Sequence, residues 1–251
     1  MISIKSPKEL ELMRVSGGIL SEILYESALL VKEGSTTMDI EVGIRKMVKK
    51  HNVKAPFLGY RGYPAMSCIS VNEEVVHGIP SGKVLMNGDI VSIDMGVSYK
   101  GYITDAARTY IVGEAEKRVG ELVKTAKDAF YKAVEFAVDG KKLYDISNAL
   151  TLLVESRGFS VVREFVSHGV GRQLHEEPFF TNFGKPHTGP MLKEGMTLAI
   201  EPMINMGVYD VKILSDGWTA VTADGEYSAH YENTVVVHKG ECEIITDITK
   251  E

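Results

Sequence analysis

Residues 90–105 read IVSIDMGVSYKGYITD, and each half of this stretch carries an aspartate in a run of β-branched and apolar residues. Such runs are typical of strands, and the turn-like residues 98–101 between them indicate an antiparallel hairpin. With the turn centred between Tyr99 and Lys100, we expect Asp94 and Asp105 to lie opposite each other, with Cβ atoms about 4.5–5.5 Å apart. Two like charges that close repel unless something positive lies between them. The hairpin therefore predicts a divalent-cation site on one face of an antiparallel sheet.

A second pair of acids, Glu201 and Glu232, has a similar setting. Glu201 ends a strand-like apolar run at 197–200, and Glu232 opens another at 233–237. Their midpoint falls within Asp216-Gly217, a dipeptide favoured in hairpin turns, although the long span indicates intervening loops. For each acid taken alone, a strand-edge carboxylate facing water is the alternative. Four carboxylates together suit magnesium or manganese, whereas an added histidine shifts the preference toward manganese, iron, cobalt or zinc.

Three of the seven histidines stand out by their context. His77 lies in the run VVHGIP, and His168 and His175 frame the run SHGVGRQLHEEP. His51 follows two lysines, which favours a solvated position. The remaining three are equally compatible with loop or surface positions: His187, His230 and His238.

The second half of the chain repeats the plan of the first. Helices are expected in two matching pairs, at about 7–34 and 38–51 and again at about 116–138 and 145–157. An offset of 107 places Asp94 on Glu201, and an offset of 127 places Asp105 on Glu232, which implies a 20-residue insertion. We therefore expect a single domain, residues 1–251, made of duplicated halves of about 1–113 and 114–251. Chance agreement between two α+β segments is the alternative.

Composition limits the class of protein. The chain has 251 residues with 28 basic and 34 acidic side chains, a net charge of -6, and only two cysteines. An acidic balance argues against a binder that tracks nucleic-acid phosphates, and two cysteines suit a reducing compartment. No apolar run approaches the ~20 residues of a membrane span, and the first residues do not resemble a signal peptide. We expect a cytoplasmic globular protein with no membrane segment, and a monomer by default.

Taken together, the motifs resemble those of the type I methionine aminopeptidases, which have the pita-bread fold. The resemblance covers essentially the whole chain and rests on residues 58–64, 68–73, 77–80, 89–94, 104–105, 168–178, 201–202 and 232–234. It implies an α+β catalytic domain with two pseudo-symmetric halves around a curved antiparallel sheet. It also implies an enzyme that removes the N-terminal methionine of nascent polypeptides near the ribosome when the second residue is small.

The resemblance further implies a centre with two divalent ions, cobalt, manganese, iron(II) or zinc. Asp94 would hold one ion, His168 and Glu201 the other, and Asp105 and Glu232 would bridge both. A metal-bridging hydroxide would attack the first peptide carbonyl. Glu201 would also shuttle a proton, His175 would stabilise the developing charge, and His77 would orient the scissile amide.

The methionine side chain would bind in an apolar, aromatic pocket that suits a flexible thioether. The matching positions are Phe57, Tyr60, Tyr63, Cys68, Leu174 and Trp218. This sequence departs from the family pattern at Leu174, where many members have an aromatic residue, while Arg61 occupies a variable position. Plain core packing is the alternative for Trp218 and the tyrosines.

Two other functions share this scaffold. Proline dipeptidases and aminopeptidase P use the same five ligands, but they usually carry a separate N-terminal domain for which 251 residues leave no room. A metal-free binding protein that has lost catalysis is the second, and the intact ligand set argues against it.

Overall fold

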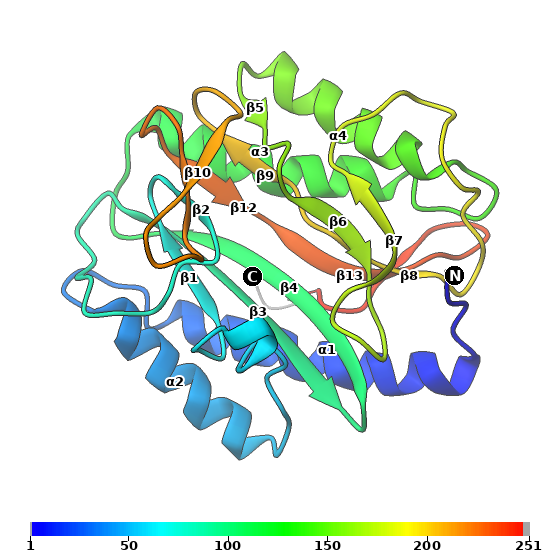
Figure 1. Cartoon of the computed structure of the whole chain (residues 1–251), viewed down its shortest axis with the longest axis horizontal. Coiled ribbons are helices and arrows are strands. Elements are labelled where there is room, and N and C mark those ends of the chain that lie inside the picture. The colour runs from blue at the N-terminus through cyan, green and yellow to red at the C-terminus, as the bar shows by residue number, and fades with distance from the viewer. Residues whose placement is uncertain (1, 248–251) are drawn as a thin grey trace.

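The computed structural model describes residues 2–247, and its main element is a curved antiparallel sheet with helices packed on it (Figure 1). The helices are α1 (Pro7–Ala28), α2 (Thr37–Lys50), α3 (Lys117–Val134) and α4 (Leu143–Ser156), with a short 3-10 turn η1 (Tyr60–Gly62). The strands of the first half are β1 (Cys68–Val71), β2 (Glu74–Val76), β3 (Ile90–Tyr99) and β4 (Tyr102–Ile111). Those of the second half are β5 (Ser160–Val161), β6 (Val166–Gly169), β7 (Glu176–Thr181), β8 (Thr197–Ile200), β9 (Met203–Asn205), β10 (Val211–Ile213), β11 (Ala220–Thr222), β12 (Ser228–His230), β13 (Glu232–Val236) and β14 (Glu243–Ile244).

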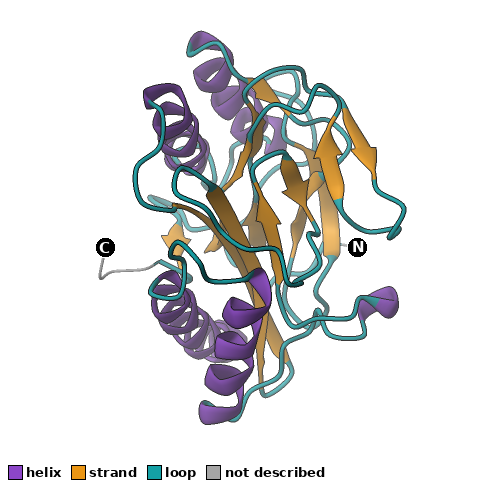
Figure 2. Cartoon of the chain, turned by 90° about the vertical axis from the view of Figure 1, so that its left-hand side faces the viewer, coloured by secondary structure: helices purple, strands orange, loops and turns teal. Residues whose placement is uncertain are grey.

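The main sheet has eight strands in the order β1-β3-β4-β13-β8-β6-β7, with β14 paired to β13. Two smaller sheets, β10-β11-β2 and β12-β9-β5, extend it. Figure 2 shows the four long helices gathered on one side of the strands, so the two largest apolar cores lie between helices and sheet. The opposite face of the sheet is left free for a site, and the expected α+β class is confirmed.

The helix ends differ from the expected ones by a few residues. The capping box of Ser6 and Glu9 is present, with a proline in the first turn, but α1 ends at Ala28, before Gly34. Gly34 instead has φ +82° in the following turn, where its N–H donates to Leu85. The third helix also ends early, at Val134, because Val138 leaves the helix to form a bridge with His238.

The register of the β3–β4 hairpin is not the expected one. Its two-residue turn is Lys100-Gly101, with φ 48° and 81°, so Asp94 lies opposite Ala107 and Asp105 lies opposite Gly96. A type I′ hairpin turn needs positive φ at both central positions, and Gly101 meets that need most easily. The two aspartates still share a face, but they are diagonal neighbours rather than a facing pair. Residues in diagonal positions on adjacent strands are typically about 7–8 Å apart. The expected Cβ separation was therefore wrong.

Backbone pairing supports a duplicated chain. Gly34 donates to Leu85 and Gly140 donates to Leu192, which are equivalent bonds at offsets of 106 and 107. Likewise Lys54 pairs with Ser98, and Ser160 pairs with Asn205.

The same comparison corrects the offset expected for the last strands. Ser98 lies opposite Ile103, and its equivalent Asn205 lies opposite Ser228, so the offset there is 125 and not 127. The insertion is therefore 18 residues, the difference between 125 and 107, rather than 20.

The inserted segment is the β10–β11 hairpin. Its turn contains Asp216 and Gly217, with φ 77° at the glycine, as the dipeptide predicted. The midpoint expected for Glu201 and Glu232 is also confirmed, since Ile200 pairs with Asn233. Because β11 pairs with β2, this hairpin reaches across from the second half to the first. Among the described residues, no helix is both long and apolar enough to cross a membrane.

Candidate metal centre and substrate pocket

The structure contains a cavity of about 330 Å³. It is lined by every residue that the sequence placed in the site: Phe57, Tyr60, Tyr63, Cys68, His77, Asp94, Asp105, His168, Leu174, His175, Glu201, Trp218 and Glu232. These residues come from both halves of the chain, and strands of the main sheet carry most of the acidic ones. One cavity therefore brings together the expected metal ligands and the expected methionine pocket.

Three of the four carboxylates are buried and incompletely hydrogen-bonded by the protein, and the fourth, Glu201, is partly buried. Asp94, Asp105 and Glu232 are 9%, 3% and 2% exposed, and Oδ1 of each aspartate and Oε1 of Glu232 lack a hydrogen-bond partner in the described chain. Burial and the charge of Asp105 raise the pKa of Asp94, and burial raises the pKa of Asp105 to about 7. Burial and the other three acids raise the pKa of Glu232 in the same way. Such a cluster is costly unless positive charge compensates it.

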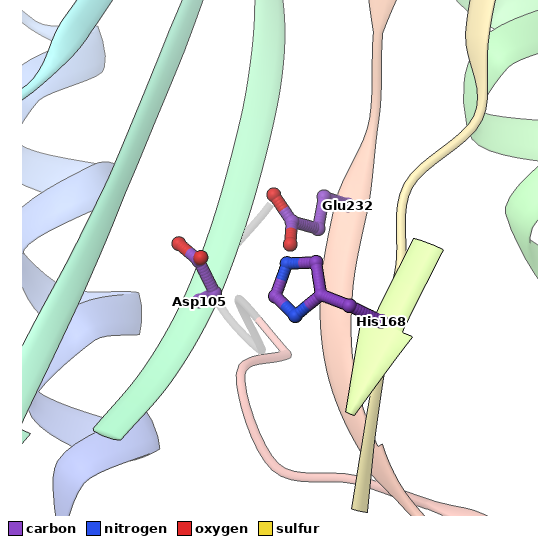
Figure 3. Close-up of side chains that lie close together, drawn as sticks. All are labelled: Asp105, His168 and Glu232. Atoms are coloured by element: carbon purple, nitrogen blue, oxygen red, sulfur yellow. The ribbon is translucent and has the colours of Figure 1, made fainter. Parts of the chain in front are cut away.

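Histidine 168 adds a nitrogen donor to this cluster. Figure 3 shows its ring converging with Asp105 and Glu232 from three different strands, and one ligand atom from each lies within 4.8 Å of the others. Its Nδ1 lies 2.9 Å from the carbonyl of Gly169, so an Nδ1–H donor leaves Nε2 free, 3.3 Å from Oε1 of Glu201. Burial and the nearby His175 lower the pKa of His168 to about 3, so the ring is neutral and can bind a metal ion.

These donors fit first-row divalent ions. The unpartnered carboxylate oxygens call for a hard cation, and the neutral imidazole extends the choice to manganese, iron, cobalt and zinc. A second group of possible ligands within 4.8 Å of one another consists of Glu201, His230 and Glu232. Glu232 is common to both groups.

The other two expected histidines, His77 and His175, line the same cavity. Nδ1 of His175 is 2.7 Å from the hydroxyl of Tyr60, and its ring packs edge-on against His168 with centroids 4.4 Å apart. Burial, Arg61 and His77 lower the pKa of His175 to about 4. The ring of His77, whose pKa burial also lowers, packs edge-on against Phe165 at 5.2 Å. Both histidines are therefore neutral at pH 7.

Two aromatic residues that line the cavity, Tyr63 and Trp218, are positioned by ring packing and by hydrogen bonds. Trp218, carried by the inserted hairpin, packs edge-on against Tyr63 with ring centroids 5.1 Å apart. The Tyr63 hydroxyl lies 3.1 Å from the carbonyl of Ser67 and 2.9 Å from that of Gly78. Cys68 pairs with Asp94 across β1 and β3, which brings its thiol to the boundary between the pocket and the acids. Burial raises the pKa of the Cys68 thiol, so the thiol is neutral.

Several cavity residues were not expected from the sequence. The cavity is also lined by Glu164, Phe165, Val166 and Phe179, and by Arg61, which had been noted only as variable. Val166 precedes His168 by two positions in β6, so strand alternation would have placed it on the same face.

His230 was also missed. A loop or surface position is wrong for this residue, because it is 1% exposed at the end of β12. Its position two residues before Glu232 was the available signal.

Comparison with known proteins agrees with the geometry. The model of metallopeptidase family M24 matches residues 11–239. The methionine aminopeptidase of Clostridium perfringens is 48% identical over 98% of this chain and 99% of its own. The crystal structure of methionine aminopeptidase from Thermotoga maritima superposes with a TM-score of 0.97 at 46% identity, covering 98% of this chain and 100% of that one.

Prolidase from Pyrococcus furiosus shares the fold. The TM-score is 0.79 at 22% identity, and the match covers 97% of this chain but 65% of the prolidase. The expected pita-bread fold is thus confirmed.

Proposed function

Because this chain belongs to metallopeptidase family M24, and within it to the methionine aminopeptidases, we propose that it removes the N-terminal methionine of nascent polypeptides when the second residue is small. The observation that carries the proposal is that a group of possible metal ligands and an aromatic pocket lie next to each other in one cavity. A group of four buried or partly buried carboxylates and His168 adjoins an aromatic pocket that contains Tyr63, Cys68 and Trp218. The first can hold divalent ions, and the second suits an unbranched thioether side chain.

The proposed centre holds two divalent ions. Asp94 would bind one, His168 and Glu201 the other, and Asp105 and Glu232 would bind both. Bound ions of this kind lower the pKa of water and supply hydroxide near neutral pH. The buried acids support this number because four negative charges need about that much positive charge to be compensated. The mixed oxygen and imidazole donors are compatible with cobalt, manganese, iron(II) or zinc.

The side chains around the ions would then act on the peptide. Glu201 is a carboxylate at the cavity wall with its pKa raised by burial and by Asp94 and Asp105, which suits a group that takes and returns a proton. When the Tyr60 hydroxyl donates to Nδ1 of His175, Nε2 of that ring carries the proton and can donate to the developing oxyanion. His77, fixed by its contact with Phe165, would orient the scissile amide.

Crowding supports the preference for a small second residue. His77 and Phe165 are packed together where they line the cavity, and Phe179 and Glu164 line it as well. With the methionine side chain in the aromatic pocket, a bulky second side chain would meet these groups. Alanine, glycine or serine would fit.

The test is release of methionine from peptides by protein that has been stripped of metal and then reloaded. Met-Ala-Ser should be cleaved after addition of Mn(II), Co(II) or Fe(II), Met-Lys-Ser poorly, and neither peptide before reloading. Glu201→Gln should be inactive but folded, whereas Glu155→Gln, on the exposed side of α4, should match the wild type. No release from Met-Ala-Ser with any metal refutes the proposal, and cleavage of Ala-Pro peptides in preference to Met-Ala-Ser would favour a proline peptidase instead.

A further inference from the structure

His230 is a buried imidazole whose ring has no hydrogen-bond partner in the described part of the chain. It is 1% exposed, and neither Nδ1 nor Nε2 forms a hydrogen bond there. Burying both polar atoms of a ring unsatisfied is unfavourable, and such groups are rare in folded proteins. The backbone of His230 is nevertheless fixed by two hydrogen bonds. The Thr109 hydroxyl accepts from the backbone N–H of His230 at 2.9 Å and lies 2.8 Å from its carbonyl.

The position of Nε2 suggests what is missing. It lies 3.9 Å from Oε2 of Glu201 and 3.9 Å from Oε2 of Glu232. These distances are too long for hydrogen bonds. Two atoms that each bind one ion at about 2.1 Å can lie up to about 4.2 Å apart, so Nε2 can share an ion with either carboxylate. One possible ligand atom from each of the three residues lies within 4.8 Å of the other two.

The duplication offers an independent observation. Backbone pairing fixes an offset of 107 for β3 and of 125 for β4. At these offsets Gly96 corresponds to Met203, and Asp105 corresponds to His230. Gly96 faces Asp105 in the first half, and Met203 faces His230 in the second. Asp94 corresponds to Glu201 at the same offset. His230 therefore occupies, in the second half, the position that Asp105 occupies in the first. Asp105 is a proposed metal ligand.

We propose that Nε2 of His230 is a ligand of the ion held by Glu201 and Glu232, so that the centre has two imidazole ligands, His230 and His168. This inference rests on the metal centre of the proposed function and adds a sixth protein ligand to it. Imidazole favours zinc, cobalt and iron over manganese and magnesium. The added ring should therefore bias the site toward the first group.

The direct test is NMR of zinc-loaded protein labelled with 15N-histidine. Long-range 1H–15N spectra show whether each imidazole nitrogen is protonated, bare or bound to metal. Nε2 of both His168 and His230 should change to the metal-bound position as Zn(II) is added. A bound His168 with a protonated or bare Nε2 on His230 refutes the inference and leaves the proposed function standing. If neither ring binds zinc, the metal centre itself is refuted.

Variants give a second readout that does not depend on catalysis. In His230→Gln, Zn(II) affinity measured by chelator competition should fall at least about tenfold, with a smaller loss for Mn(II). The matched control is His238→Gln, since His238 also faces two glutamates, Glu194 and Glu243, but lies outside the cavity. It should bind both ions as the wild type does. Equal affinities in His230→Gln and the wild type would contradict the inference.

Discussion

Glu41 on α2 is a fully buried carboxylate that binds the backbone segment next to the proposed methionine pocket. Its Oε1 accepts hydrogen bonds from Nε of Arg45 at 2.6 Å and from the backbone N–H of Met66 at 2.9 Å. Its Oε2 accepts from the N–H and the hydroxyl of Ser67, at 3.2 and 2.6 Å. Ser67 is the neighbour of Cys68 and, through its carbonyl, the partner of Tyr63. Glu41→Gln therefore tests whether this anchor sets the pocket.

The expected cost follows from the hydrogen bonds that glutamine cannot make. Glutamine has one side-chain oxygen in place of two, so its NH2 group faces at least one buried N–H that then lacks an acceptor. This costs about 1–3 kcal/mol, and the remaining hydrogen bonds are weaker because the acceptor is no longer charged. Arg45 is 43% exposed, so its ion pair adds no more than about 1 kcal/mol. Together these terms give a loss of about 3 kcal/mol, or roughly 6–12 °C in Tm for a chain of this size.

Urea and thermal unfolding, followed by the fluorescence of the only tryptophan, Trp218, measure this loss in the pocket itself. Glu22→Gln is the matched control, because Glu22 is 48% exposed and pairs only loosely with Lys50 and His51. It should change stability by less than about 0.5 kcal/mol. KM for Met-Ala-Ser should rise in Glu41→Gln more than kcat falls. If Glu41→Gln and Glu22→Gln lose the same stability, Glu41 is not the anchor of the pocket.

Two further predictions concern the site itself. In metal-stripped protein, Asp105, with its pKa raised from 3.8 to about 7, keeps in the folded state a proton that the unfolded chain has released, so its contribution to stability declines as pH rises. Urea unfolding of the stripped proteins measures this effect. The free energy of unfolding of Asp105→Asn, relative to that of the wild type, should rise by about 2 kcal/mol between pH 5 and 7, because the histidine contributions cancel in the difference. A difference that stays constant with pH would contradict the raised pKa. Tyr60→Phe removes the hydroxyl that orients His175, and kcat should fall about tenfold with KM nearly unchanged in steady-state assays, since one hydrogen bond is worth about 1.4 kcal/mol. An unchanged kcat would show that packing alone orients the ring.

Much of the fold followed from local patterns. Apolar periodicity and strand runs located the four helices and the two central strands, because these signals depend on residues that are neighbours in sequence. The register of β3 and β4 did not follow, since it depends on which two residues of the turn adopt positive φ. A shift of the turn centre by one residue moved the facing partner of Asp94 by two.

In the candidate site, too, some residues could be identified from local sequence and others could not. The acids could be found because a carboxylate inside an apolar run is unusual wherever the chain goes. His230 could not be assigned in this way, because its burial depends on strands far away in sequence, and a histidine near a strand end is equally common on a surface. Phe165 and Phe179 were missed for a similar reason, since an apolar residue beside a strand gives no sign of whether it faces a core or a cavity.

The central strand β13 also bears on how the molecule folds. Thr234 receives a hydrogen bond from the backbone N–H of Asp105 and donates one to its carbonyl, 129 positions away. Contacts of such long sequence separation form slowly, because a large loop must close first. During synthesis, Asp94 and Asp105 emerge well before Glu232. The hairpin that carries the two aspartates therefore lacks its β13 neighbour until late in synthesis, and we expect ion capture to coincide with a late step of folding.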